Sequence, residues 1–247
     1  MKQLVVRTAL GAGMPLAGTG CAIATDMLEA VAHARGGDPF DATSLTEDYE
    51  LGLRIAELGG SGRFVRAIDA DGGLVAVRAF FPATLDAAVR QKARWMTGIA
   101  LAGWDRTGWA HAGAFADHWM RMRDRRAPIG MVVLAVAYAA LVIWGLAAVL
   151  HRILPGGTGE APWPMPWLLV ANTALLGWRL GARMTFTARC YGPVEALWSV
   201  PRFVVGNYIA LIAAPRALVR YVAMLRGAPP VWDKTRHEFP DLPESDR

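Results

Sequence analysis

The sequence is poor in charge and in cysteine. Charged residues make up 19% of the 247 positions and apolar residues 54%, which is lean in charge for a soluble domain. Only two cysteines occur, Cys21 and Cys190, and neither lies in a His/Cys ligand pattern. This excludes a disulfide framework and a zinc site of the common spacings. We expect both cysteines to be small buried residues in a reducing compartment.

Common phosphate-binding and nucleic-acid-binding patterns are also missing. The chain contains no GxGxxG or GxxxxGK run, and no basic patch interleaved with aromatics outside its apolar regions. Nucleic acid is therefore not an expected partner. The net charge of +5 comes largely from arginines at 121–126 and 179–226, beside the most apolar stretches. Basic residues in such positions are typical of the cytoplasmic edge of a membrane.

Two apolar runs predict a membrane region over residues 128–226. We expect spans at about 129–150 and 167–182, forming a hairpin whose connecting loop faces outward because arginines flank the other ends. The run at 194–223 is interrupted by Arg202. It is predicted as an interfacial or re-entrant segment, with a third span as the alternative. Residues 227–247 are polar and proline-rich, which indicates a cytoplasmic tail.

Residues 1–108 carry alternating helix and strand signals. Helices are predicted at 25–33, 44–58 and 84–103, the second starting in a capping box of Ser44 and Glu47. The third begins at the N-cap Thr84 and ends at Gly103. Short strands at 63–67 and 74–80 flank a turn at 71–73. The expected fold class is therefore α/β, joined to a helical membrane region.

Residues 109–127 are predicted to form an amphipathic helix on the membrane surface. Trp119, Met120 and Met122 share one side, and the end of the segment is strongly basic. Such a helix suits a membrane interface. The alternative is an ordinary helix with a solvated basic end.

Three side chains on the 84–103 helix form the first candidate site. Gln91, Arg94 and Trp95 stand at i, i+3 and i+4, so they share one helix face. An amide, a guanidinium and an indole on one surface suit an anionic, sugar-like ligand. The alternative is a core tryptophan beside an arginine in a salt bridge.

Two further stretches could contribute to the same site. Thr46, Glu47 and Asp48 begin a helix, where the dipole favours an ionised carboxylate. These acids could also merely complement the dipole. The glycine-rich stretch 17–23 lets backbone approach a ligand closely; its alternative is a tight turn before a helix. It contains these candidate residues: Gly18, Thr19, Gly20 and Cys21.

The order of these stretches resembles the membrane-embedded family 2 glycosyltransferases of the cellulose-synthase type. The resemblance rests on the 17–23 loop, the Thr-Glu-Asp run at 46–48, Gln-x-x-Arg-Trp at 91–95 and the apolar helices that follow. Segments at 96–104, 119–126 and 232–240 are similar more closely to the bacteriophage-adsorption protein B group. The similarity extends over residues 16–240.

The resemblance implies the C-terminal half of a GT-A-type domain followed by transmembrane and interfacial helices. It implies a hexosyltransferase of the bacterial inner membrane that moves sugar from a nucleotide-sugar donor to a growing envelope or extracellular polysaccharide. Asp48 would be the general base, positioned by Glu47 and Thr46. Arg94 with Gln91 would stabilise the leaving diphosphate, and Trp95 would stack on the acceptor sugar.

Further implied partners are the lipid bilayer and an outer-membrane export protein, and backbone at 18–21 would line the acceptor site. Mg2+ or Mn2+ would be the cofactor, with its principal ligands outside this chain. The Asp-x-Asp that the family carries ahead of its other motifs is missing, since residues 1–16 hold no carboxylate and the first acidic residue is Asp26. The chain is therefore expected to be a truncated or split product, detectable from an in-frame Asp-x-Asp encoded upstream of Met1. The alternative function is a non-catalytic inner-membrane scaffold of an export or phage-adsorption system.

Overall fold

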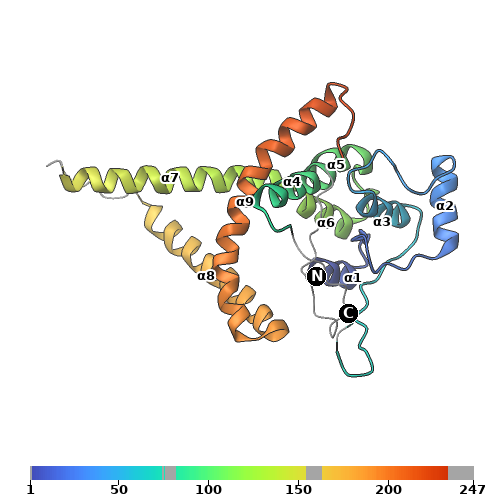
Figure 1. Ribbon diagram of the computed structural model, residues 1–247, viewed down its shortest axis with the longest axis horizontal. Coiled ribbons are helices and arrows are strands. Elements are labelled where there is room, and N and C mark those ends of the chain that lie inside the picture. The colour runs from blue at the N-terminus through green and yellow to red at the C-terminus, as the bar shows by residue number, and fades with distance from the viewer. Residues whose placement is uncertain (1, 74, 76–81, 154–162, 233–247) are drawn as a thin grey trace. The chain divides into compact units, whose positions relative to one another are not determined.

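The computed structural model describes residues 2–73, 75, 82–153 and 163–232. Within these ranges the regular structure is helical, with a short π-helical stretch, η1, between α4 and α5 (Figure 1). The elements are α1 (Lys2–Leu10), α2 (Thr25–Arg35), α3 (Glu47–Glu57), α4 (Leu85–Met96), η1 (Thr97–Leu101), α5 (Ala102–Thr107), α6 (Phe115–Arg125), α7 (Ala127–Ile153), α8 (Met165–Tyr191) and α9 (Pro193–Leu225).

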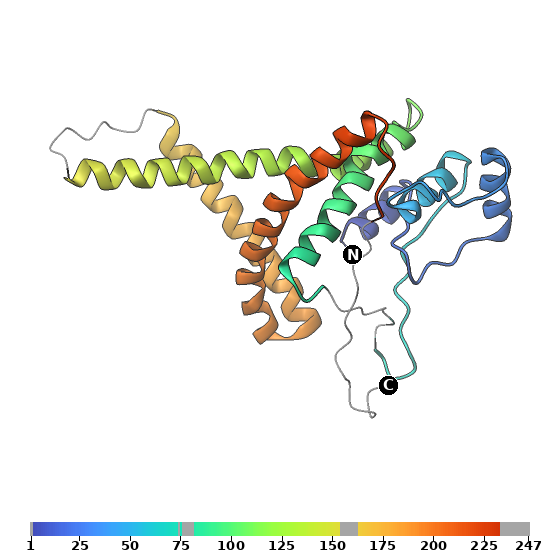
Figure 2. The same ribbon diagram turned by 45° about the horizontal axis from the view of Figure 1, so that its top comes forward.

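The chain divides into two compact units: Met1–Met131 with Ile212–Arg247, and Val132–Leu211. In the first unit α3, α5, η1 and α6 pack together, and α2 lies against α3 (Figures 1 and 2). Its core includes the fully buried side chains of Leu53 and Met120. Burying such side chains is the main favourable term for folding.

The predicted α/β fold class is wrong, because the described residues contain helices and no strand. Residues 63–67 are extended, and among the described residues their backbone pairing is confined to the end next to the turn, where the Ala67 carbonyl accepts from the Val75 N–H at 3.0 Å. The Phe64 N–H donates instead to the Thr8 hydroxyl at 2.9 Å. The hairpin-type turn is organised by the Asp69 carboxylate, which accepts from the Gly73 N–H at 2.6 Å. Most of the predicted second strand, 74 and 76–80, lies outside the described residues.

The helix boundaries differ from the prediction in an informative way. Thr84 caps α4 as expected, accepting from the Ala87 N–H at 3.3 Å. The capping box is wrong: α3 starts at Glu47, and the Ser44 hydroxyl bonds the Glu50 carboxylate at 2.7 Å instead. Gly103 does not end a helix but lies inside α5, where a side chain would collide with the Gly98 carbonyl. The helix α1 was not predicted.

The arginines of α6 have a role that their sequence pattern did not indicate. Arg121 and Arg125 are 1% and 4% exposed. Arg121 donates to the Thr107 carbonyl at 2.7 Å, and both guanidinium groups donate to the Gly108 carbonyl. They therefore satisfy the backbone acceptors left at the C-terminal end of α5. The outward surface of α6 is apolar, with Phe115 and Trp119 81% and 57% exposed.

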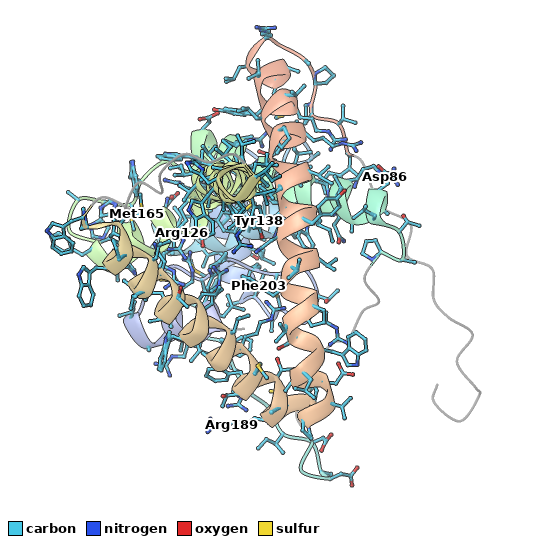
Figure 3. All side chains as sticks on the ribbon, turned by 90° about the vertical axis from the view of Figure 1, so that its left-hand side faces the viewer. Asp86, Arg126, Tyr138, Met165, Arg189 and Phe203 are labelled. Carbon is cyan, nitrogen blue, oxygen red and sulfur yellow. The ribbon has the colours of Figure 1, made fainter. Side chains whose placement is uncertain are left out.

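In the second unit the helices expose apolar side chains along most of their surface. By length and composition, α7 and α9 could each cross a membrane, with mean hydropathy 2.5 and 1.5 over their most apolar windows. The predicted span 129–150 lies in α7. The predicted span 167–182 lies in α8, the helix that carries the labels Met165 and Arg189 in Figure 3. It is less apolar than α7 and α9 and does not count as a candidate span among the described residues. The third-span alternative corresponds to α9.

Both cysteines are exposed, so the expectation of buried thiols is wrong. Cys21 lies on the glycine-rich loop rather than in the core, and Cys190 lies on the surface of α8.

Candidate functional site

The first part of the site is the inward face of α4. As predicted, Gln91, Arg94 and Trp95 lie on one helix, between the Thr84 cap and η1. Gln91 is 6% exposed, whereas Arg94 and Trp95 are half-buried. This face therefore combines a buried amide with a cation and an indole that solvent or a ligand can still reach.

The second part is the residue before α3, Thr46, which lies against Gly98 of η1 just after the end of α4. A Cβ at Gly98 would lie 2.6 Å from the Thr46 hydroxyl oxygen, so this position accepts no side chain. Thr46 is 5% exposed and does not cap its helix. The hydroxyl is thus turned toward the α4–η1 junction. Single-turn π segments of this kind are frequent at functional sites.

Asp48 lies next to the glycine-rich loop and within the electrostatic influence of Arg94 on α4. Its Oδ2 atom lies 3.4 Å from the place where a Gly18 side chain would begin. Burial raises the pKa of Asp48, and the neighbouring Glu47 carboxylate raises it further. The Tyr49 N–H and the Arg94 guanidinium act in the opposite sense and favour the ionised form. Asp48 is therefore a more basic carboxylate than usual that still lies in the field of Arg94.

Three buried polar atoms at this place have no hydrogen-bond partner among the described residues. They are the Thr46 hydroxyl oxygen, Gln91 Oε1 and Arg94 Nε. Burying such atoms unpaired costs about 1–3 kcal/mol each. All three come from the stretches that the sequence singled out. Unpaired buried groups beside a basic carboxylate indicate a site that a polar ligand completes.

Trp232 completes the surroundings of Arg94, and the sequence reasoning did not place it in the site. The Arg94 guanidinium lies over the Trp232 ring, 5.0 Å from its centroid. Trp232 is 46% exposed. A cation over an indole face is an attractive contact. The signal available in the sequence was the similarity of 232–240 to the family, which named the segment but gave it no role.

Two buried networks hold the start of α3. Glu50 accepts from the Ser44 hydroxyl and lies 3.8 Å from the Arg106 guanidinium. Burial raises the pKa of Glu50, while the Ser44 bond and Arg106 oppose the shift. On the preceding residue, the Tyr49 hydroxyl donates to the Asp124 carboxylate at 2.8 Å. These contacts hold the first turn of α3, which carries Asp48, and none of them was predicted.

A third contact anchors the same helix to α1. The Asp124 carboxylate also pairs with Arg7, whose side chain is 1% exposed. Burial raises the pKa of Asp124, and the Arg7 cation counters this. An ion pair this deeply buried is costly to break, because either partner left alone is an uncompensated charge.

The predicted glycine-loop residues do not all reach the site. Gly18 adjoins Asp48, but Thr19, Gly20 and Cys21 line a separate cavity of about 400 Å3. That cavity is bounded by α2, the later turns of α3 and the 60–65 segment, and Asp48 does not line it. The loop therefore divides between two places.

The described residues do not form a cation site by themselves. Nowhere in 2–73, 75, 82–153 and 163–232 do three or more His, Cys, Asp or Glu side chains gather as metal ligands. Divalent cations of the Mg2+ and Mn2+ type need several oxygen ligands. Glu47 and Asp48 supply only two carboxylates from one helix turn.

The glycosyl transferase family group 2 model matches residues 1–213. The chain belongs to this family. Among curated proteins it is 31% identical over 264 residues to bacteriophage adsorption protein B of Escherichia coli K12. The same identity holds for bacteriophage N4 adsorption protein B of Escherichia coli O157:H7. No solved structure matches.

The match to these family 2 relatives covers 98% of this chain but 35% of the relatives. The chain thus spans about a third of their length. The family match includes all the residues that converge on Asp48 and Arg94, apart from Trp232, which lies beyond its end.

Proposed function

We propose that this chain carries the acceptor-side and membrane parts of a glycosyltransferase that extends an envelope or extracellular polysaccharide with hexosyl units from a nucleotide-sugar. The observation that carries the proposal is the convergence of Asp48, Arg94, Gln91 and Thr46, with three buried polar atoms unpaired among the described residues. Family membership supports the reaction class.

The proposed reaction is an inverting displacement at the anomeric carbon. Asp48 accepts the proton of an acceptor hydroxyl while the oxygen forms its bond to that carbon. The bond from carbon to the nucleoside diphosphate breaks, and the diphosphate leaves with the electron pair. A carboxylate whose pKa is raised by burial is better suited to take this proton, since its conjugate acid is weaker. The Arg94 cation favours the ionised form of Asp48 before the reaction.

The remaining polar groups would bind the two substrates. The Arg94 guanidinium, with the Gln91 amide, stabilises negative charge on the leaving diphosphate. Thr46 bonds a substrate hydroxyl, and Glu47 tunes the basicity of Asp48. Trp95 and Trp232 offer indole faces on which sugar rings stack. We propose that Mg2+ or Mn2+ assists the diphosphate, with its ligands supplied from outside the described residues.

We propose further that the protein lies in the bacterial inner membrane, with this site on the cytoplasmic side. The support is that α7 and α9 are long and apolar enough to cross a bilayer, and that arginines adjoin the same stretches. An outer-membrane export protein would then receive the polymer.

The test is release of nucleoside diphosphate from a panel of nucleotide-sugars by membranes carrying this chain, alone and with any coding sequence in frame upstream of Met1. Asp48→Asn keeps the size of the side chain and removes the base, so we expect it to reduce the rate of diphosphate release at least a hundredfold. Its folding should be unchanged on size exclusion. Turnover retained in this variant would remove Asp48 from the base role. Release by neither form would favour the scaffold alternative.

A further inference from the structure

A pair of tryptophans forms an exposed aromatic surface that the Asp48–Arg94 site does not use. Trp104 lies in α5, and Trp109 lies in the loop that follows this helix. Their ring centroids are 5.5 Å apart, and the two ring planes meet at 82°. The side chains are 39% and 49% exposed. Two large indoles that stay in contact with solvent are a candidate binding surface.

Arg125 holds both indoles in place from the side of the core. Its guanidinium lies over the Trp104 and Trp109 rings, 4.6 and 5.0 Å from their centroids. Arg125 is 4% exposed, so the indoles cover it and present their remaining surface outward. Its donation to the Gly108 carbonyl fixes the backbone between the two tryptophans. The rings are therefore held in place before a ligand arrives, and little conformational entropy is lost when a ligand stacks on them.

The surroundings of the two rings are polar. The His118 ring lies 5.6 Å from the Trp109 ring, and its Nε2 atom is 3.1 Å from the His111 carbonyl oxygen. Asp105 is exposed in the same stretch of chain. Residues 102–114 contain no Val, Leu, Ile, Met or Phe. A sugar ring has a face of C–H groups and an edge of hydroxyls, so it suits flat apolar rings bordered by hydrogen-bonding groups. A hydrocarbon chain could not satisfy the polar border.

We propose that Trp104 and Trp109 form a platform that binds an uncharged stretch of polysaccharide, whose hexose rings stack on the exposed indole surface. The ligand is uncharged because the Arg125 cation beneath the rings is covered. The choice of a polysaccharide rests on the proposed function, but binding at the platform requires no transfer step. A polymer held at a second place stays attached between additions, because rebinding is then intramolecular.

The proposal is tested with the purified full chain in neutral detergent, labelled with fluorotryptophan and observed by fluorine NMR. The probes are linear hexasaccharides of glucose, galactose, mannose or N-acetylglucosamine. We expect at least one hexasaccharide to shift the Trp104 and Trp109 resonances and to leave that of Trp119, on the outward surface of α6, in place. No shift with any probe, or a shift confined to Trp119, would overturn the proposal. Release of the bound hexasaccharide on transfer into phosphatidylglycerol nanodiscs would assign the two rings to the bilayer and overturn it equally.

Three variants separate ring stacking from a merely apolar contact. Trp109→Leu keeps an apolar side chain and removes the flat ring, so we expect the hexasaccharide to bind about fivefold to tenfold more weakly. Trp109→Phe keeps a ring and should retain most of the affinity, which a loss of folding at this position would not allow. The matched control Trp119→Leu, at a side chain that is 57% exposed, should bind as the unmodified chain does. Unchanged affinity in Trp109→Leu, or an equal loss in Trp119→Leu, would contradict the assignment.

Diphosphate release from the same preparations distinguishes this proposal from the proposed function. Shifts of the Trp104 and Trp109 resonances without release would support the platform and count against the transfer reaction. Release without these shifts would support the transfer reaction and remove the platform.

Discussion

Gly52 provides the sharpest test of how the site is built. It lies in the middle of α3, where helix propensity alone would favour alanine. A Cβ on Gly52 would stand 2.2 Å from the Met14 carbonyl oxygen, 2.7 Å from the Leu16 nitrogen and 2.8 Å from the Pro15 Cα. All three are backbone atoms, so no side-chain rotation relieves the clash. The segment they form leads directly to Gly18, which adjoins Asp48.

The size of the effect follows from these distances. Ordinary contacts of a Cβ begin at 3.4 Å, so Gly52→Ala must move the 14–16 backbone away from α3 by roughly an ångström. Overpacking of this kind costs about 1–3 kcal/mol, and the better helix propensity of alanine returns at most about 1 kcal/mol. We expect a net loss of about 1–2 kcal/mol, or a Tm lower by about 2–8 °C for a chain of this size.

The assay is thermal unfolding of the purified protein in one detergent at one scan rate, since membrane proteins often unfold irreversibly. Gly130→Ala in α7 is the matched control, because nothing lies within 4 Å of a side chain there. It should leave Tm unchanged or raise it slightly. If Gly52→Ala were as stable as Gly130→Ala, α3 could not approach the 14–16 segment as described, and the placement of Gly18 beside Asp48 would be wrong.

Three other outcomes are expected. Arg94→Lys should lose most diphosphate release, because an ammonium cannot make the guanidinium's forked contact; near-normal rates would favour a salt-bridge role. Glu47→Gln should lower the pKa of Asp48, since the Glu47 carboxylate raises it, and so move the acidic limb of the kcat/KM–pH profile to lower pH; a shift to higher pH would contradict this. Arg7→Gln should destabilise by about 3–5 kcal/mol by leaving a buried carboxylate unpaired, whereas Arg35→Gln, at a 31% exposed ion pair, should cost about 0–1 kcal/mol; similar losses of Tm in both would refute the burial argument.

The sequence predicted the α4 face well because that face depends on local rules. Thr84 is a strong N-cap residue, and the spacing of Gln91, Arg94 and Trp95 places them together on any helix. The proximity of Asp48 to Arg94 was expected only from the family resemblance. No local pattern specifies it, since 46 residues separate the two and tertiary packing through Gly98 and Thr46 brings them together.

The fold class could not be predicted in the same way. Val65 and Ile68 have strand propensity, yet they are 74% and 69% exposed. A strand needs a continuous row of backbone partners. Here the Ala67 carbonyl accepts from the Val75 N–H beside the turn, but the Phe64 N–H donates to the Thr8 side chain. Strand propensity correctly predicted an extended segment, but it does not predict which backbone groups pair.

The basic end of α6 shows why charge patterns alone mislead. The position of Arg121 and Arg125 before an apolar run predicts a membrane surface, and their i, i+4 spacing would suit a helix lying on it. The deciding fact lies in another element: α5 ends at Thr107 with carbonyl groups that have no helical partner. An arginine that donates to such carbonyls gains a hydrogen bond and a favourable interaction with the negative end of the helix dipole. Buried, Arg125 also lies over the Trp104 and Trp109 rings at 4.6 and 5.0 Å. The same two arginines that seemed to face lipid therefore hold α5 and α6 together. What α6 turns outward is apolar, so any contact it makes with a bilayer rests on Phe115 and Trp119 rather than on these arginines.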